Sequence, residues 1–162
     1  MQDISIEHVP TKSEKGLALR LYSGSLAGLT SPIQNYTPFI LADITLEPGI
    51  STTLDVPAFY TAFLYVIDGN VLVGDEGKQL KTNQVGWLDR PSAEGDSQLQ
   101  LKAGEKGGRV VLYAGQPQND EIVSHGPFIA DTQDDIRRLY KEYRNGEMGH
   151  IAMVEEEQKL VW

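Results

Sequence analysis

Short runs in which apolar and polar residues alternate, separated by Gly, Pro, Asp and Asn, make up most of the chain. Such alternation predicts strands with one buried face, and many short strands divided by turn residues are typical of a β-sandwich or small barrel. The strands that the pattern predicts are Leu17–Tyr22, Phe39–Leu46, Ser51–Asp55, Phe63–Ile67, Val71–Val73, Gln84–Leu88, Gln98–Lys102 and Arg109–Ala114. We therefore expect a mainly β protein.

Turn residues predict how neighbouring strands connect. Pro48-Gly49 predicts a turn after Phe39–Leu46, because Pro and Gly suit turn positions. Asp68-Gly69 predicts a tight hairpin between Phe63–Ile67 and Val71–Val73. Asp75-Glu76-Gly77 predicts a second hairpin further along the chain.

One amphipathic helix is expected near the end of the chain. Asp131 or Thr132 can cap its start, and Thr132 with Asp135 resembles a capping box. Gly146 can provide the left-handed residue that ends a helix. Apolar side chains recur at spacings of three and four residues, at Ile136, Leu139, Tyr140 and Tyr143. An apolar stripe of this kind has to cover another surface, so we interpret these four residues as a possible interface.

Length and charge limit the possible functions. The 162 residues are enough for one domain with a sizeable core. The absence of cysteine excludes disulfides and thiol chemistry, and the net charge of −9 opposes direct binding to nucleic acid. The polar N-terminus does not resemble a signal peptide, and no apolar run approaches the roughly 20 residues that span a bilayer. We therefore expect a cytoplasmic protein with no membrane partner.

Histidine would be the most direct sign of catalysis in this chain. The three histidines, His8, His125 and His150, lie outside the series of strands. His125 precedes the predicted helix and is interpreted as a turn residue, because a general base would need a nucleophile or partner acid that the sequence does not reveal. Neither a Gly-x-Ser-x-Gly motif nor a phosphate-binding glycine loop is present. We predict no catalytic residue.

The order of strands and turns resembles a cupin barrel, whose metal-binding members place two His two residues apart after the Pro-Gly turn. A transition metal needs several nitrogen and oxygen ligands that converge. Between Gly49 and Gly69 the chain has no His, and Asp55 is the single carboxylate before Asp68. We therefore expect no bound metal and no other cofactor.

Four residues are candidates to line a pocket for an apolar or planar ligand: Tyr60, Tyr65, Trp87 and Asp55. We favour the other interpretation of the three aromatic rings, in which they fill a dry core.

The most specific motif is SHGPFIADTQDDIRRLYKEYRNGEMG, which is similar to the C-terminal signature of the pirin family. The family pattern is His-Gly-Pro-Phe, then Thr, an acid followed by Ile, Tyr-Arg-x-Gly and a final Gly. The matching residues here are His125, Gly126, Pro127, Phe128, Thr132, Asp135, Ile136, Tyr143, Arg144, Gly146 and Gly149. Upstream, TPFILADITLEPG and FLYVIDGNVLVG resemble the second cupin domain of that family, and GLALRLYSGSLAGLTSPI resembles its first strand and loop.

The resemblance implies a protein related to bicupins, in which iron is held by His and Glu of the N-terminal cupin. Some members resemble quercetin dioxygenases, and others act through protein partners, including transcription regulators. Here the resemblance runs from Gly16 to Gly149 and covers the second cupin alone, so no catalytic residue carries over. It implies a lead-in at 1–16 similar to an interdomain linker, a single cupin-type β-barrel or sandwich (a double-stranded β-helix) at 17–130, a helix at 131–146 and a tail at 147–162.

The leading hypothesis is a metal-free cupin domain that binds a protein partner, either a second cupin chain or another copy of itself. One alternative is a metal-dependent dioxygenase of the quercetinase type. The other is a module that binds a small molecule inside the barrel.

Overall fold

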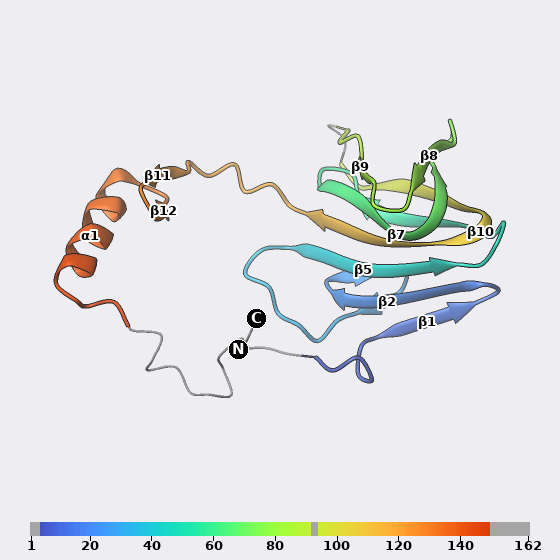
Figure 1. The fold of residues 1–162 in the computed structure, drawn as a ribbon, viewed down its shortest axis with the longest axis horizontal. Helices are drawn as coiled ribbons and strands as arrows, with labels where there is room; N and C mark the ends of the chain where they lie inside the picture. Colours follow the sequence, from blue (N-terminus) through green and yellow to red (C-terminus); the bar gives the residue numbers. More distant parts are fainter. Residues whose placement is uncertain (1–3, 92–93, 150–162) are drawn as a thin grey trace. The chain divides into compact units, whose positions relative to one another are not determined.

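The computed structural model describes residues 4–91 and 94–149. Its elements are β1 (Thr11–Glu14), β2 (Leu17–Ser23), β3 (Ser25–Leu26), β4 (Leu29–Thr30), β5 (Phe39–Leu46), β6 (Ser51–Pro57), β7 (Thr61–Val73), β8 (Lys78–Lys81), β9 (Val85–Trp87), β10 (Asp96–Gly115), β11 (Val123–His125), β12 (Phe128–Ala130) and α1 (Gln133–Arg144). They form two compact units, Met1–Pro117 and Gln118–Trp162, which are described separately (Figure 1). No helix among the described residues is long and apolar enough to cross a membrane.

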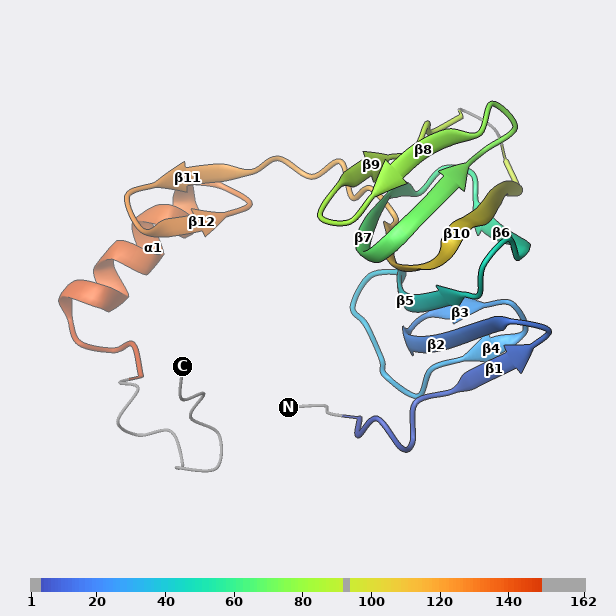
Figure 2. The same cartoon turned by 45° about the vertical axis from the view of Figure 1, so that its right-hand side comes forward.

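The first unit is an antiparallel β-sandwich, which confirms the mainly β prediction. The strands follow the order β1-β2-β5-β10-β7-β8, with β6 paired to β10 and β9 paired to β7. The described strands thus leave edges instead of closing into a complete barrel. A separate small hairpin, β3–β4, lies near β2 (Figure 2).

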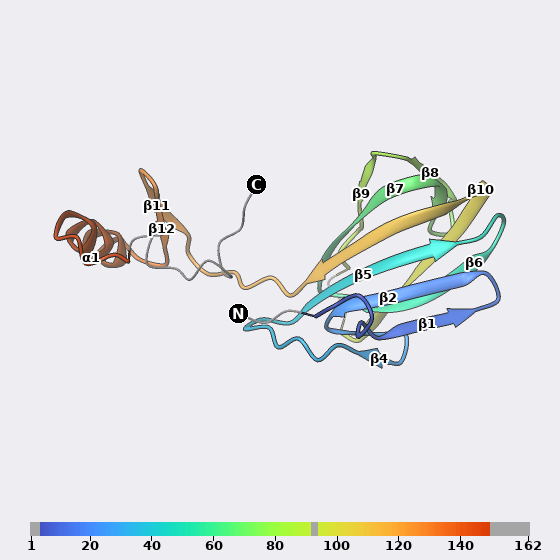
Figure 3. The same cartoon turned by 60° about the horizontal axis from the view of Figure 1, so that its bottom comes forward.

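A bend folds this sheet into two layers. Strands β7 and β10 continue through the bend, and the chain passes from β5 to β6 beside it. The first half of the long strand β10 pairs with β6, and its second half pairs with β5 (Figure 3). The chain passes from β5 to β6 at Pro48-Gly49, and β7 follows the other side of β10 along both halves. At the level of the bend, the Gly49 amide donates to the Gly104 carbonyl oxygen at 3.3 Å. The predicted Pro48-Gly49 turn is therefore a corner of the sandwich.

The predicted hairpin at Asp68-Gly69 is wrong. Both residues lie inside the continuous strand β7, and Gly69 has a φ of 70° beside a register shift between β7 and β10. An Asp-Gly pair serves a bulge as well as a hairpin, because both need a residue with positive φ. The same bend explains why Gln98–Lys102 and Arg109–Ala114, predicted as two strands, belong to the single strand β10. The hairpin at Asp75-Glu76-Gly77 is confirmed, since these residues connect β7 to β8.

The lead-in at 1–16, which the resemblance likened to an interdomain linker, includes the edge strand β1, which pairs with β2 from Thr11↔Arg20 to Glu14↔Leu17. The side chains of β1 are mostly exposed, so its residues show no apolar alternation, and only backbone pairing defines this strand.

Inward-facing side chains of the other strands form one aliphatic core. Its largest fully buried members are Leu19, Leu21, Ile44, Leu46, Leu64, Leu101, Leu112, Val66, Val71 and Val110.

The second unit consists of the β11–β12 hairpin and the helix α1. The hairpin turns at Gly126-Pro127, with His125 opposite Phe128. Ile136 is buried, and the Tyr140 ring lies edge-on to Phe128, with ring centroids 4.9 Å apart. The Tyr140 hydroxyl donates to the His125 carbonyl oxygen at 3.4 Å. Residues 118–130, expected in the β domain, therefore belong with the helix.

The helix begins as the capping residues predict. Thr132 is the N-cap, and its Oγ1 accepts a hydrogen bond from the Asp135 amide at 3.1 Å. The same hydroxyl donates to Asp135 Oδ2 at 2.6 Å, and this bond, followed by that from Arg138, lowers the pKa of the Asp135 carboxyl. At the other end, Gly146 has a φ of 70°, as expected for the residue that ends a helix.

Replacing Thr132 with alanine is expected to destabilise the second unit by about 1 kcal/mol, because the Asp135 amide loses its partner at the helix start. Thr132→Ser keeps the hydroxyl and is the matched control. Hydrogen exchange of the amides in the first turn of α1 measures the effect. Equal protection in the two variants would contradict the capping role.

Candidate functional site

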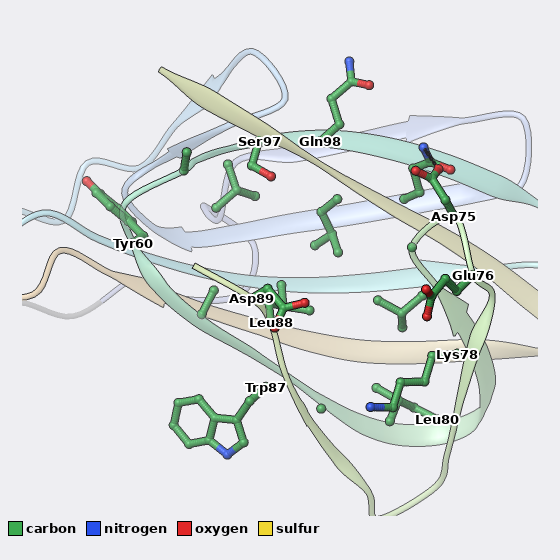
Figure 4. A pocket seen from close by; sticks show the side chains of 18 of the residues that line it. Tyr60, Asp75, Glu76, Lys78, Leu80, Trp87, Leu88, Asp89, Ser97 and Gln98 are labelled. Atoms are coloured by element: carbon green, nitrogen blue, oxygen red, sulfur yellow. Dashed lines mark hydrogen bonds between the residues drawn. The ribbon is translucent and has the colours of Figure 1, made fainter. Parts of the chain in front are cut away.

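The main hollow of the first unit is a cavity of about 650 Å³ near the β7–β8 turn (Figure 4). Strands β6, β7, β8, β9 and the beginning of β10 surround it. Its lining residues are Val56, Pro57, Ala58, Tyr60, Ala62, Val73, Gly74, Asp75, Glu76, Lys78, Leu80, Val85, Gly86, Trp87, Leu88, Asp89, Ser97, Gln98, Leu99 and Gln100. Apolar side chains with a few polar groups are the usual composition of a small-molecule pocket.

Charged groups of the cavity lie in the β7–β8 connection and after β9. Asp75 and Glu76 come from the turn, Lys78 from the start of β8, and Asp89 from the segment after β9. The Gln100 side-chain amide donates to Asp75 Oδ1 at 2.6 Å, which orients that carboxylate. The cavity therefore presents more acidic than basic groups to a ligand.

Two of the four predicted pocket residues reach this cavity. Tyr60 lines it, and burial raises the pKa of its phenol above the usual value. Trp87 also borders it (Figure 4). The Trp87 indole packs on Phe63, with ring centroids 4.9 Å apart. A planar ligand in the cavity would therefore meet Tyr60 more directly than Trp87.

Asp55 and Tyr65 are not lining residues of this cavity. Asp55 is exposed between the buried residues Leu54 and Val56, since neighbouring strand residues face opposite sides. Tyr65 alternates in the same way with Leu64, and its hydroxyl donates to Asn83 Oδ1 at 3.0 Å.

The side chains inside the sandwich do not fit a transition-metal site. Among the described residues, no three His, Asp or Glu side chains gather closely enough to hold a metal ion. His8 hydrogen-bonds Ser5 through Nδ1 at 2.7 Å, and the exposed His125 ring lies edge-on to Tyr140 at 5.5 Å. Both histidines thus contact neighbours in their own part of the chain, and His150 lies outside the described residues. The predicted interpretation of His125 as a turn residue agrees with its place at the end of β11.

Most side chains of the predicted helix interface are buried or pack against other residues of the second unit. Ile136 is buried, Tyr140 packs on Phe128, and Leu139 is half-buried. Tyr143 is 64% exposed and is the member most available to another molecule. The sequence interpretation missed a second apolar surface, formed by outward-facing aromatic residues of the sheet. Its signal was present in FLYVI and VVLY, where apolar residues follow one another, as in strands that are covered on both faces.

Comparison with a family model gives a match over residues 41–149, described as the pirin C-terminal cupin domain. Human pirin is 30% identical over 148 residues, which cover 91% of this chain and 50% of that protein. Pirin-like protein 2 of Arabidopsis thaliana is 29% identical over 152 residues, which cover 91% of this chain and 47% of that protein. The chain thus spans about half the length of the curated relatives it matches.

A crystal structure of quercetin 2,3-dioxygenase from Acinetobacter baumannii has the same fold, with a TM-score of 0.77 and 30% sequence identity. The alignment covers 93% of this chain and 51% of that one. This likeness extends over the β-sandwich and agrees with the predicted cupin architecture.

Proposed function

Because this chain belongs to the pirin family, as a domain of its C-terminal cupin type, we propose that it binds no metal and works by binding another protein. The observation that carries the proposal is the aliphatic interior of the sandwich. Inward-facing positions of β6, β7 and β10 hold Leu54, Leu64 and Leu99, which offer no electron pair to a metal. A divalent transition metal needs several nitrogen, oxygen or sulfur donors at one point.

Protein binding is supported by the length of the relatives. The residues aligned with this chain make up 50% of human pirin and 51% of the Acinetobacter baumannii dioxygenase. We infer that a domain that matches half of such a protein keeps a surface for contact with another domain. We propose that any metal chemistry belongs to a partner domain, and that this chain provides binding surface. The partner is a second cupin chain or another copy of this one.

A chelator tests the metal-free proposal. Treatment with EDTA followed by dialysis is expected to leave the thermal unfolding midpoint unchanged, because a ligand that is absent cannot contribute to stability. Addition of Fe²⁺ or Zn²⁺ to the dialysed protein is the reciprocal measurement, and it should also leave the thermal unfolding midpoint unchanged. A midpoint that falls with EDTA and recovers with one of these ions would overturn the proposal.

The alternative of a metal-dependent dioxygenase has one specific support, the 30% identity with the Acinetobacter baumannii quercetin 2,3-dioxygenase. Oxygen uptake with quercetin and added Fe²⁺ separates this alternative from the first proposal. An uptake rate proportional to the protein concentration would favour the enzyme, whereas a rate equal to that of free iron would remove it.

The alternative of a small-molecule module is supported by the cavity of about 650 Å³ beside Tyr60. Quercetin serves as a planar probe, with binding measured by calorimetry in the absence of metal. Saturable binding that weakens in Tyr60→Ala would favour this alternative. If neither the unchanged protein nor Tyr60→Ala gives a heat of binding with quercetin, the cavity is only a solvent-filled opening and this alternative is removed.

A further inference from the structure

The outer surface of the main sheet carries an unusual set of residues. Outward-facing side chains of an antiparallel sheet are normally polar, because that face meets water. Here they form an aromatic face, which we define by eight residues of β5, β7, β9 and β10: Phe39, Leu41, Phe63, Tyr65, Val85, Trp87, Val111 and Tyr113.

Strand register makes the aromatic face continuous. Tyr113 on β10 lies opposite Leu41 on β5 and Phe63 on β7, and Phe63 lies opposite Trp87 on β9. In the next row, Val111 lies opposite Asp43 on β5 and Tyr65 on β7, and Tyr65 lies opposite Val85 on β9. Side chains that face each other across strands are close neighbours on one surface. The first row is thus apolar across all four strands, and the second is apolar across β10, β7 and β9.

The rings in this face contact one another and remain open to solvent. Phe63 and Tyr113 are stacked at 4.7 Å with an interplanar angle of 13°, and Phe39 lies 6.4 Å from Tyr113. Trp87 is 69% exposed and Val85 is 49% exposed. A contiguous apolar patch of this kind on a protein surface marks an interaction site.

Charges next to the aromatic face permit two copies to approach. Although the chain has a net charge of −9, the carboxylate of Asp43, at the β5 end of the second row, is paired with Arg109 at 2.6 Å. Arg20 on β2 is exposed and lies opposite Asp43 in register. Two such faces can meet without placing unpaired carboxylates against each other, which would otherwise oppose association of an acidic chain.

We infer that this chain forms a two-fold symmetric dimer in which the aromatic faces of two copies pack against each other. This inference rests on the proposed function, since it identifies the protein partner as a second copy. A flat sheet face suits another flat sheet face, with the strands of the two sheets crossing at about 30°. A two-fold axis tilted from β10 by half of this crossing angle places β2 of one copy over β9 of the other. Arg20 of each copy then lies over the row that ends at Val85, two residues along β9 from Trp87. Its long side chain can reach the exposed indole of Trp87, where a cation–π contact adds to the apolar burial.

The size of the face sets the strength of this dimer. With strands about 4.8 Å apart and a rise of about 3.4 Å per residue, the four strands offer roughly 400 Å². A standard interface buries about 800 Å² per partner, so the dimer is weak and depends on concentration. Two-fold pairing is the commonest form of self-association for a single type of chain.

Sedimentation velocity over a concentration series, from about 1 µM to about 1 mM, the range of weak associations, tests the dimer. The weight-average mass is expected to rise from 17.9 kDa towards twice that value. Trp87→Arg should hold the mass at that of the monomer, because it places a charge in each half of the apolar contact. Tyr36→Arg is the matched control, since Tyr36 is fully exposed outside the aromatic face and the charge change is the same. Circular dichroism verifies that both variants are folded.

Fluorescence gives a second measurement on the intact chain. The protein has two tryptophans, so Trp162→Phe leaves Trp87 as the single indole. Its emission should move to shorter wavelength as the concentration rises and the indole leaves water. A monomer throughout the series, or a dimer that Trp87→Arg does not weaken, would overturn the inference. Either result leaves the metal-free proposal to be decided by its own chelator test.

Discussion

Replacing Gly69 with alanine is expected to lower the free energy of unfolding by about 3 kcal/mol, the upper range for one strained backbone position. Gly69 has a φ of 70°, where a side chain is strained. A Cβ at this position would also lie 2.3 Å from the Gly107 carbonyl oxygen, which belongs to the adjacent strand β10. Because the obstacle is backbone at the shared bend, relief requires the two strands to separate.

Gly74→Ala is the matched control for this effect. Gly74 has nearly the same φ, 71°, but a Cβ at this position would have no other atom within 4 Å. Alanine there carries the conformational cost alone, about 1 kcal/mol. Urea unfolding of both variants measures the difference. Equal losses of stability would contradict the close approach of β7 and β10.

Replacing Arg109 with alanine is expected to destabilise the sandwich by about 2 kcal/mol, because it leaves a buried carboxylate without its partner. Arg109 Nε and Nη2 donate to Asp43 at 3.0 Å and 2.6 Å, and this hydrogen bonding raises the pKa of the Arg109 guanidinium. The Asp43 side chain is 5% exposed, whereas that of Arg109 is 43% exposed. The exposed partner reduces the loss below that of a fully buried ion pair.

The two members of this pair should therefore respond unequally. Asp43→Ala leaves an arginine that can turn into water, so it should cost less than Arg109→Ala. The double variant removes the unpaired carboxylate and should be more stable than Arg109→Ala alone. Denaturant unfolding of the three variants tests this order. A double variant whose loss equals the sum of the single losses would contradict a direct interaction.

Local sequence signals predicted the elements of this chain better than their connections. Alternation located β5 at Phe39–Leu46, and the cap at Thr132 located the start of α1. Asp68-Gly69 was misleading because a bulge and a hairpin need the same positive φ, and the choice between them depends on β10, far away in sequence. The edge strand β1 has no apolar alternation, so only its pairing with β2 defines it.

The sequence predicted only part of the candidate site, because it did not reveal which side of some strands faces the core. Tyr60 lines the cavity and Trp87 borders it, whereas Tyr65 does not reach it. Tyr65 and Trp87 lie on strands whose residues are apolar on both sides. A continuous apolar run does not reveal which side faces the core. The inward position of Leu64 assigns Tyr65 to the outer face, and Phe63 and Trp87 lie there together. The same ambiguity hid the aromatic face.

The aromatic face and the aliphatic interior lead to one functional account. In the function proposed above, the inward leucine and valine residues make the sandwich a scaffold, and the outward aromatic residues provide its binding surface. In this account, the pirin C-terminal cupin fold contributes association, and iron chemistry, where it occurs, belongs to another domain.

Metal content measured by elemental mass spectrometry tests this account most directly. The protein should be purified without chelators and without a histidine tag, from cells supplemented with iron, zinc and manganese. The account predicts far less than one metal ion per chain. One ion per chain would contradict it, and Asp55 and the three histidines would then be the first positions to substitute.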